Sequence, residues 1–284
     1  MHTLDEVEAL RQCARRVETP CGDGTLVWHV WGPETAPPVL LLHGGSGSWT
    51  HWVRNIDPLA EAGWQVLVPD MPGFGDSAAP PDGQDADVLP GWLELGLQTL
   101  VGAAPLPMVG FSFGGLVAGL WAQALPARLS RLVLVGCPSL SDKRLAPLDL
   151  RRWDTLPAGP ERDAVHHHNL LQLMLSNPAA ATPLAVALHA ANVQRDRLRK
   201  RRLMLTDALV PVLATLPCPV HGLWGEDDAL YRQRRPLVGR VLGTAPRFAG
   251  LQWLPGGHWV AFEAAEAFNT ALLAALGPPP TTMD

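Results

Sequence analysis

The sequence predicts an α/β fold, in which a mostly parallel sheet has helices on both faces and carries an inserted helical segment. Short runs rich in Val, Leu and Trp alternate with longer segments of helical spacing, a pattern typical of a parallel sheet. Two of the runs, PVLLL and RLVLV, are continuously apolar, as expected for strands that helices cover on both faces. The 284 residues are 47% hydrophobic and 17% charged, which supplies enough apolar surface for such a sheet.

The apolar runs and the turn residues between them predict the individual elements. Strands are expected at residues 25–31, 38–42, 64–68, 107–111, 131–137, 219–224 and 248–254. The first of these alternates less cleanly than the others, so we expect it to be an antiparallel edge strand. Helices are expected at residues 51–62, 89–101, 113–124, 207–216, 232–242 and 261–276.

The strand pattern disappears between residues 138 and 206. This segment carries apolar helical stretches and a basic run, QRDRLRKRR, whose commonest explanation is a solvated helix face. A connection of this length without structure of its own would be unusual in a compact domain. We therefore predict a helical cap at 138–206, inserted into a core formed by 1–137 and 207–284, with a loose tail from Gly277 onward.

Charge and cysteine content exclude several classes of partner. The net charge of −5 argues against nucleic acid, because nucleic-acid binders usually carry a basic excess. No apolar stretch approaches the ~20 residues of a membrane-spanning helix, and the acidic N-terminus does not resemble a signal peptide. The four cysteines show neither a CxxC pair nor metal-ligand spacing. A cytoplasmic protein without a membrane or nucleic-acid partner is expected, and a homodimer is compatible with the sequence.

A candidate nucleophile lies in the run PMVGFSFGG, where Ser112 stands between a predicted strand and a predicted helix. A serine on such a tight turn presents its hydroxyl above the sheet, and Gly110 and Gly114 leave room for the two backbones to approach. The helix that begins at Phe113 directs its first N–H groups at this position, so the Phe113 N–H is expected to bind an oxyanion. The same pattern arises by chance or from a helix cap, so a second element is needed.

The run LLLHGGSGSW provides that second element, since it also follows an apolar strand. Gly44 and Gly45 can bring backbone N–H groups close to the nucleophile. We predict that the Gly45 N–H is the second oxyanion donor and that Gly44 contacts the substrate. The run contains neither GxxxxGK[ST] nor the third glycine of GxGxxG, so no nucleotide is predicted.

A serine hydroxyl needs a neighbouring base, and that base needs a carboxylate to orient it. The last two predicted strands end in LWGEDDAL and LPGGHWVAF, at the edge where open parallel sheets form their sites. Of the ten histidines only His258 follows the WGEDD turn, so the chain order serine, acid, histidine selects it. Residue pattern alone leaves the carboxylate open among Glu226, Asp227, Asp228 and Asp142.

Taken together, the runs HGGSGSW, VPDMPGFGDS, GFSFGG, WGEDD and GGHWVAFE resemble the motifs of the α/β-hydrolase superfamily, in the family's order. The resemblance covers residues 25–137 and 219–276 and implies an eight-stranded, mostly parallel α/β-hydrolase sheet. Family members with G-x-x-D after the penultimate strand have the acid at the fourth position, which is Asp228 here. The resemblance therefore implies a triad of Ser112, His258 and Asp228, and a structural role for the VPDMPGFGDS turn beside the site.

Related epoxide hydrolases and haloalkane dehalogenases carry aspartate in place of Ser112, so the serine favours acyl-type chemistry. Among serine members the chain is similar to the meta-cleavage product hydrolases, which cleave a carbon–carbon bond and often have tryptophan after the histidine, as His258-Trp259 does. That likeness implies an arginine in the cap that binds a substrate carboxylate, and Arg195 is the candidate by position. The chain departs from that family at His51, where asparagine is usual.

The predicted function is a serine hydrolase that cleaves a carboxylic ester through an acyl-enzyme. Two alternatives remain, a carbon–carbon bond hydrolase of the meta-cleavage type and a slow-turnover ligand receptor on the same fold. Trp153 and Trp259 are expected to line a pocket for an apolar acyl or aryl group of a small molecule, although tryptophan is more often a core residue. The run His166-His167-His168 predicts no metal site, because contiguous side chains diverge, and no cofactor is expected.

Overall fold

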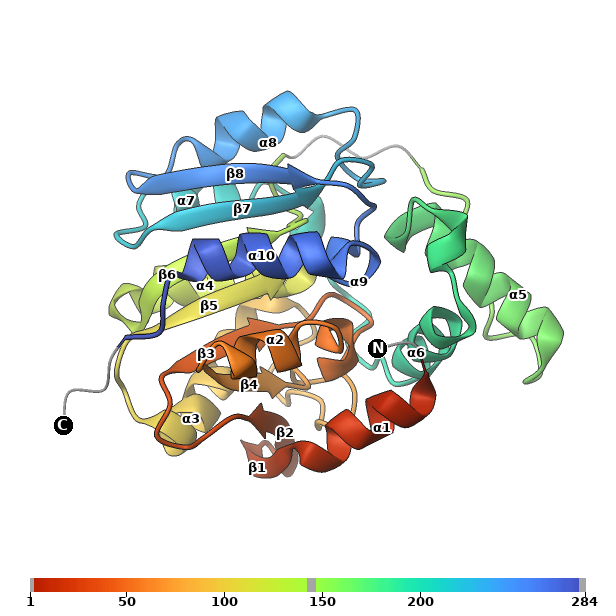
Figure 1. The fold of residues 1–284 in the computed structure, drawn as a ribbon, viewed down its shortest axis with the longest axis horizontal. Helices are drawn as coiled ribbons and strands as arrows, with labels where there is room; N and C mark the ends of the chain where they lie inside the picture. The colour runs from red at the N-terminus through yellow and green to blue at the C-terminus, as the bar shows by residue number, and fades with distance from the viewer. Residues whose placement is uncertain (1–2, 142–146, 281–284) are drawn as a thin grey trace.

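The computed structural model of the protein describes residues 3–141 and 147–280. Its centre is an eight-stranded sheet with the strand order β1-β2-β4-β3-β5-β6-β7-β8 (Figure 1). The strands are β1 (Arg15–Cys21), β2 (Gly24–Trp31), β3 (Pro38–Leu42), β4 (Gln65–Pro69), β5 (Leu106–Phe111), β6 (Leu129–Val135), β7 (Val220–Gly225) and β8 (Phe248–Leu254). Strand β2 pairs antiparallel with β1 and β4, and every other pair in the sheet is parallel. The predicted mostly parallel sheet is confirmed.

The edge of the sheet differs from the prediction. Strand β2 is antiparallel, as expected, but it lies between β1 and β4, and β1 is the edge strand. The sequence of β1, RRVETPC, buries only Thr19 and Cys21, so it carries little of the apolar signal that reveals a covered strand. The preceding helix α1 (Leu4–Cys13) was also not predicted, although Thr3 and Glu6 form a reciprocal capping box at its start.

Helices cover both faces of the sheet, as the apolar strands require. One face packs against α3 (Leu89–Val101), α4 (Phe113–Ala124), α7 (Leu209–Leu213) and α8 (Arg235–Leu242), and the other against α1, α2 (Ile56–Glu61), α9 (Val260–Glu263) and α10 (Ala265–Leu276). Side chains alternate between the two cores along each strand. In β3, Leu40 and Leu42 belong to the first core, and Val39 and Leu41 belong to the second.

Two predicted helices are interrupted in the structure. The segment 51–62 is divided into a 3-10 turn η1 (Trp49–Trp52) and the helix α2, and 261–276 is divided into α9 and α10. The first break is bound to both halves of the second segment, because the Asn55 side-chain amide donates to the Ala261 carbonyl of α9 at 3.0 Å and to Asn269 Oδ1 of α10 at 2.7 Å. A tertiary polar contact of this kind leaves no signal in local apolar spacing.

The chain between β6 and β7 forms helices beside the sheet. Its described part, 147–206, contains α5 (Pro160–Asn169), a π-helical turn η4 (Leu170–Met174), η5 (Pro178–Ala180), α6 (Pro183–Gln194) and η6 (Leu203–Leu205), and no strand. Figure 1 shows α5 and α6 at the end of the sheet where the parallel strands terminate, apart from the helices on its faces. Leu170, Met174, Leu184 and Leu188 continue the core on the α10 face. The division into a core and a cap stays a prediction.

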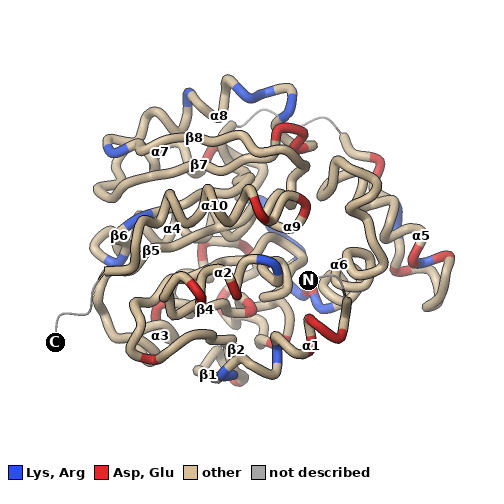
Figure 2. The backbone as a smooth tube through the Cα atoms, viewed as in Figure 1, with Lys and Arg blue, Asp and Glu red and all other residues tan. Residues whose placement is uncertain are grey.

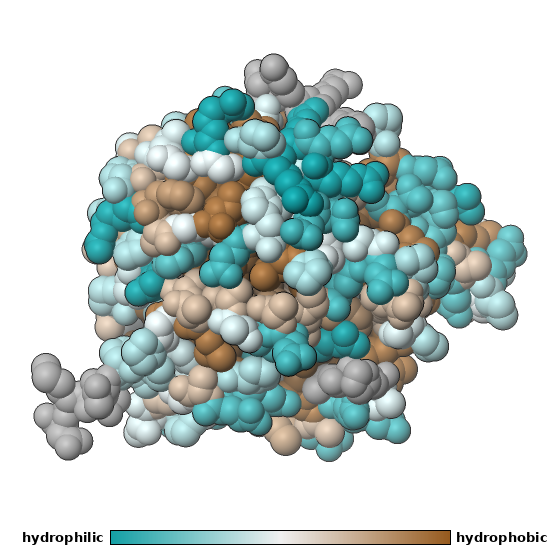
Figure 3. Space-filling view, turned by 45° about the horizontal axis from the view of Figure 1, so that its top comes forward, coloured by the Kyte–Doolittle hydropathy of each residue, from teal (hydrophilic) through white to brown (hydrophobic). Residues whose placement is uncertain are grey.

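Charged side chains are absent from the central strands of the sheet. Strands β3, β4 and β5 carry no charged residue, and Figure 2 shows Lys, Arg, Asp and Glu along the surrounding helices and loops. Figure 3 shows hydrophilic residues over much of the face turned forward, with smaller hydrophobic patches between them. Within the described part of the chain, no helix is both long and apolar enough to cross a membrane.

Candidate active site

Ser112 occupies the turn between β5 and α4. Its backbone has φ +49° and ψ −118°, a left-handed conformation that a residue with a side chain rarely adopts, and its N–H donates to the Val135 carbonyl at 2.7 Å. A Cβ at Gly114 would lie 2.5 Å from the carbonyl oxygens of Leu42 and His43, so only glycine lets α4 begin this close to the end of β3. The predicted strand–turn–helix setting of the serine is therefore present.

The imidazole of His258 lies between Ser112 and Asp228. Its Nε2 is 2.9 Å from Ser112 Oγ, and its Nδ1 is 2.9 Å from Asp228 Oδ2. Because Asp228 is wholly buried and accepts at Nδ1, the neutral ring carries its proton there and leaves Nε2 to accept from the serine hydroxyl. The three side chains that the sequence predicted as a triad are thus connected by consecutive hydrogen bonds.

Of the three candidate carboxylates that the structure describes, only Asp228 is hydrogen-bonded to the histidine. Asp228 follows β7, and its second oxygen, Oδ1, accepts the N–H of Leu230 at 2.9 Å. Asp227 is exposed to solvent and Glu226 is half-buried. Asp142 lies outside the described residues. The turn after β7 therefore points the third of its acidic side chains inward.

The two predicted oxyanion donors come from loops that lie side by side. A Cβ at Gly45 would be 3.5 Å from the Cβ of Phe113, which is the first residue of α4. The N–H of Gly44 is occupied, since it donates to His51 Nδ1 at 3.1 Å. No hydrogen bond from the N–H of Gly45 or Phe113 is found among the described residues. Both of these amides remain available for a ligand oxygen.

Two buried histidines that the sequence did not single out as site residues shape the glycine loop. His43 donates from Nδ1 to the Gly44 carbonyl at 2.7 Å and accepts the Met71 N–H at Nε2, 2.9 Å away. Burial lowers the pKa of His43, and burial followed by the neighbouring histidines lowers the pKa of His51 well below its usual value. Both rings are therefore neutral at pH 7. The run HGGSGSWTH, in which the two histidines flank the glycines, was the sequence signal that could have identified them.

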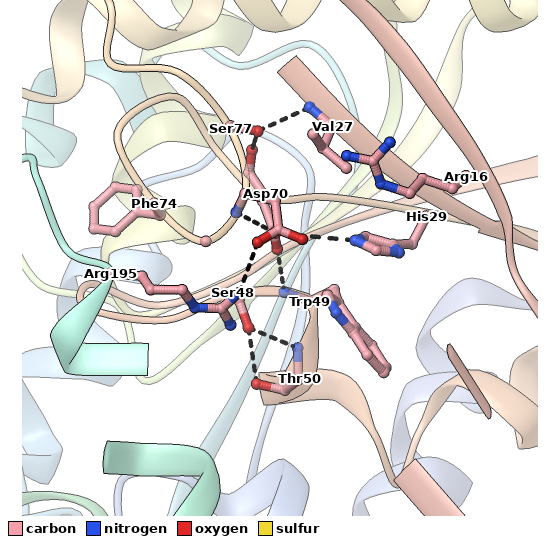
Figure 4. Close-up of polar contacts among 12 residues, drawn as sticks. Arg16, Val27, His29, Ser48, Trp49, Thr50, Asp70, Phe74, Ser77 and Arg195 are labelled. Atoms are coloured by element: carbon pink, nitrogen blue, oxygen red, sulfur yellow. Dashed lines mark hydrogen bonds and ion pairs between the residues drawn. The ribbon is translucent and has the colours of Figure 1, made fainter. Parts of the chain in front are cut away.

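The VPDMPGFGDS turn holds the glycine loop from the other side (Figure 4). Asp70 accepts the N–H of Trp49 at 2.8 Å and the N–H of Asp76 at 2.9 Å, and its Oδ2 lies 3.9 Å from Nε2 of His29. Burial acts to raise the pKa of Asp70, but His29 and the amide donors outweigh it, so the pKa is lowered and the carboxylate is charged. A Cβ at Gly75 would lie 2.2 Å from that carboxylate. The geometry agrees with the structural role expected for this turn.

Arg195, the predicted partner of a substrate carboxylate, pairs with Asp76, whereas Arg201 lies beside the glycine loop. Arg195 follows the last turn of α6 and donates to Asp76 Oδ1 at 2.8 Å, a half-exposed pair near the turn in Figure 4. The guanidinium carbon of Arg201, six residues further along, lies 3.5 Å from the Cβ position of Gly45 and 5.7 Å from the ring centre of Phe113. The segment after α6 has no regular structure, so the place of Arg201 could not be inferred from helical spacing.

The predicted tryptophans have different surroundings. Trp259 is buried, stacks on Phe262 at 4.2 Å and donates from Nε1 to the His51 carbonyl at 2.9 Å, so it is a core residue next to His258. Trp153 belongs to the insertion, where its ring centre lies 5.3 Å from that of His166.

A row of rings continues from Trp153 towards the site. His166 lies 5.5 Å from His189, between ring centres, and His189 is close enough to His51 to help lower its pKa. His166 is fully buried, and neither of its ring nitrogens has a hydrogen-bond partner among the described residues. Trp153, His166 and His189 thus form a ring cluster on the insertion side of the site.

The insertion is hydrogen-bonded to the glycine loop. Ser46 Oγ donates to Asp196 Oδ2 at 2.5 Å, and Asp196 also binds Arg201 at 2.8 Å. Ser48 Oγ donates to Asn192 Oδ1 at 2.7 Å. Among the residues that the structure describes, no group of three or more His, Cys, Asp or Glu side chains is arranged to hold a metal ion. The polar contacts at the site instead connect its loops to α6 and the segment after it.

Comparison with known proteins gives a consistent family. A family model described as "alpha/beta hydrolase fold" matches residues 37–177. The chain is 30% identical to a 2-hydroxy-6-oxononadienedioate/2-hydroxy-6-oxononatrienedioate hydrolase of Paraburkholderia phymatum, over 87% of this chain and 88% of the relative. It is 28% identical to a 2-hydroxy-6-oxo-6-phenylhexa-2,4-dienoate hydrolase of Burkholderia cepacia, over 83% of this chain and 86% of the relative.

Solved structures show the same fold at lower identity. A meta-cleavage product hydrolase from Pseudomonas fluorescens superposes with a TM-score of 0.74 at 20% identity, covering 91% of this chain and 96% of that one. The carboxylesterase CesB from Bacillus subtilis superposes with a TM-score of 0.76 at 20% identity, covering 96% and 97%. At this identity the likeness is one of fold, shared by proteins that are named for different reactions.

Proposed function

Because the chain belongs to the α/β-hydrolase family, we propose that it is a serine hydrolase in which Ser112 attacks a carbonyl carbon of a small-molecule substrate. His258 accepts the serine proton and returns it to the leaving group, and Asp228 keeps the imidazole in the required tautomer. The N–H groups of Gly45 and Phe113 hold the oxyanion. The observation that carries this proposal is the line of two 2.9 Å contacts from Ser112 Oγ through His258 to Asp228.

We propose that the bond cleaved is the carbon–carbon bond next to the 6-oxo carbon of a 2-hydroxy-6-oxo-dienoic acid. Attack at that carbonyl gives a tetrahedral adduct, bond cleavage passes a proton to the departing carbon, and water releases the acid from Ser112. Support comes from relatives named for such dienoic acids, which match more than four fifths of this chain. This reading takes the place of ester cleavage as the first candidate.

Arg201 is the proposed partner of the substrate carboxylate. It lies beside Gly45, and its side chain is largely shielded from water, which strengthens a charge-assisted hydrogen bond to a carboxylate. Its Nη1 donates to Asp196 at 2.8 Å and its Nη2 donates to the Ser46 hydroxyl at 3.1 Å, which fixes the plane of the guanidinium, and no hydrogen bond from its Nε to a described residue is found. A planar guanidinium can bind two carboxylate oxygens at once.

The ring cluster of Trp153, His166 and His189 is the proposed partner of the distal end of the substrate. The relatives are named for different groups there, a phenyl group in one case and a second carboxylate in the other. Burial lowers the pKa of His189 to about 4 and also lowers the pKa of His166, so both rings are neutral at pH 7. Neutral rings favour the phenyl substrate, since a second carboxylate would lose its hydration without gaining a cation.

The insertion 138–206 is proposed to act as a cap that shields these groups from water. The contacts of Ser46 with Asp196 and of Ser48 with Asn192 support this role, because they fasten the insertion directly over the oxyanion loop. A closed cap strengthens the electrostatic contacts beneath it and prevents side reactions with water.

A carboxylic ester is the second candidate substrate. It is favoured by His51, which takes the place of the asparagine usual in meta-cleavage product hydrolases and whose Nδ1 is held by the Gly44 N–H. The triad and oxyanion donors would serve an ester equally well, because ester cleavage also proceeds through a tetrahedral adduct.

The experiment is a comparison of substrates on wild type and Ser112→Ala. The panel holds the phenyl dienoic acid, its dicarboxylate counterpart and short p-nitrophenyl esters, and kcat/KM is measured for each by absorbance. We expect the phenyl dienoic acid to be preferred and Ser112→Ala to lose at least about 10³-fold. Ser130→Ala, at an exposed serine, is the control and should retain full activity. Preference for esters would select the second candidate, and no turnover together with no fluorophosphonate labelling of Ser112 would reject the hydrolase.

A further inference from the structure

The loop that carries His258 is fastened to the insertion by one carboxylate, that of Glu263. Its Oε2 accepts the N–H of Gly257 at 2.6 Å and the N–H of Ser176 at 3.0 Å. Its Oε1 accepts the N–H of Asn177 at 2.6 Å and the hydroxyl of Ser176 at 2.9 Å. One side chain therefore joins two segments that are about eighty residues apart in the sequence.

Direct backbone packing surrounds this carboxylate. A Cβ at Gly257 would lie 2.7 Å from the Ser176 nitrogen and 2.9 Å from the Met174 carbonyl oxygen. Trp259 N–H donates to that same carbonyl at 2.7 Å. His258 is thus flanked on both sides by residues whose backbone contacts the segment 174–177 of the insertion.

On its other side the Gly257 peptide packs tightly against the end of β7. A Cβ at Gly225, the last residue of β7, would lie only 2.0 Å from the Gly257 carbonyl oxygen. Asp228 follows β7 three residues later and binds His258. The Gly257 peptide is therefore held between the strand that leads to the acid and the insertion.

We propose that Glu263 is a positioning residue, through which the docking of segment 174–177 keeps His258 aligned with Ser112. This inference rests on the proposed function of that pair. Without the carboxylate, the amides of Gly257, Ser176 and Asn177 lose their common acceptor, and an amide left without a partner favours conformations that find another. The His258 loop then departs from its docked position for part of the time. A displacement of about 1 Å at the reacting group is enough to cost ~10²-fold in rate.

The alternative is that Glu263 only stabilises the fold. In that case its loss lowers the melting temperature but leaves the proton contact between His258 and Ser112 unchanged in the folded molecules. The two accounts differ in the reactivity of Ser112 and in the state of His258, and both can be measured without the natural substrate.

The test uses the full chain with Glu263→Gln, Glu263→Asp, Ser176→Ala and the double variant Glu263→Gln/Ser176→Ala. Glu266→Gln is the matched control, since Glu266 is an exposed carboxylate three residues further along. The readouts are the rate of Ser112 labelling by a fluorophosphonate across pH, the low-field NMR signal of the His258 Nδ1 proton, kcat and KM on the best substrate of the panel, and the melting temperature.

We expect Glu263→Gln to slow labelling by 10-fold to 100-fold, to broaden or shift the His258 proton signal and to lower kcat more than it raises KM. Glu263→Asp keeps the charge with a shorter reach and should recover part of the loss. Ser176→Ala should have a smaller effect that disappears in the Glu263→Gln background, because the hydroxyl acts through the carboxylate.

A wild-type labelling rate and a wild-type His258 signal in folded Glu263→Gln would overturn the proposal, as would an equal loss in Glu266→Gln. Failure of the proposed function has a different signature. If wild type hydrolyses nothing in the panel but Ser112 still reacts with the fluorophosphonate, the labelling rates test Glu263 directly. If Ser112 does not react, the His258 signal in the same variants decides.

Discussion

Gly136 lies against the imidazole of His258, at the end of β6: a Cβ at this glycine would sit 3.1 Å from the His258 Nδ1 and 3.2 Å from the Asp228 Oδ2. The backbone of Gly136 also has φ +54°, a conformation that a side chain disfavours. The contact between His258 and Asp228 therefore depends on the absence of a side chain at Gly136.

Gly136→Ala should accordingly lower kcat by at least about 10-fold, because the new methyl group displaces the ring or its partner. Gly102→Ala is the matched control, since Gly102 also has a positive φ but nothing within 4 Å of its Cβ position. Both variants should lose about 1–2 kcal/mol of unfolding free energy from the backbone alone. Equal activity in the two variants, measured at saturating substrate, would contradict the steric account.

Asp228→Asn should reduce kcat/KM by about 10⁴-fold with little change in the fold. The amide can donate to Nδ1, which stabilises the tautomer with its proton on Nε2 and removes the acceptor for the serine proton. Asp227→Asn changes the exposed neighbour in the same turn and should leave kcat/KM within about twofold of wild type. A similar loss in both variants would indicate that the turn, rather than the Asp228 carboxylate, is at fault.

Arg201→Gln should raise KM for the dienoic acid and lower its kcat/KM by 10-fold to 100-fold, as expected for one buried charge-assisted contact. A neutral p-nitrophenyl ester has no carboxylate to lose, so its kcat/KM should change by less than threefold. Arg195→Gln removes the half-exposed pair with Asp76 and serves as the control. Parallel losses on the acid and the ester would show that Arg201 supports the loop and does not select the substrate.

The free energy of unfolding should decrease as the pH is lowered, because His189 takes up a proton less readily in the folded chain than in the unfolded chain. Its folded pKa is about 4, below the usual 6.5, because burial penalises the charged ring. Between these values the unfolded chain binds more protons than the folded chain does. The contribution of His189 to the free energy of unfolding is therefore complete above pH 6.5 and is lost towards pH 4, where the loss reaches about 3 kcal/mol.

Melting temperatures measured from pH 7.5 to pH 4 test this directly. His189→Gln should flatten the acid side of the profile, whereas His167→Gln, at an exposed position in α5, should reproduce the wild-type curve. The buried histidines His43 and His51 have lowered pKa values too, so some acid sensitivity remains in every variant. A steeper acid decline in His189→Gln than in wild type would reverse the predicted sign.

Strands and helices whose signals are local were predictable from the sequence. The strands at 38–42 and 248–254 and the helices at 89–101 and 113–124 have the predicted bounds, because apolar runs and turn residues mark them. Strand β1 was missed because an edge strand with charged residues has little apolar signal. The GFSFGG motif between a strand and a helix was enough to predict Ser112, and the chain order serine, acid, histidine was enough to predict His258.

The remaining site residues depend on tertiary contacts that no spacing reveals. The turn after β7 determines which carboxylate of the WGEDD run faces inward. In the sequence, the family resemblance was needed to choose Asp228. The place of Arg201 beside Gly45 depends on the segment after α6, where Asp196 binds both Ser46 and Arg201. The contacts of Glu263 with Ser176 and Asn177 join residues that are separated in the chain by α6, β7 and β8, and they leave no pattern in the sequence.

The insertion is fastened at two places, by Asn192 and Asp196 over the glycine loop and by Ser176 and Asn177 at Glu263. Trp153 and His166 precede both fastenings in the chain. If the ring cluster contacts the substrate as proposed, substitutions around α5 should change substrate preference while leaving both fastenings, and with them the triad, in place.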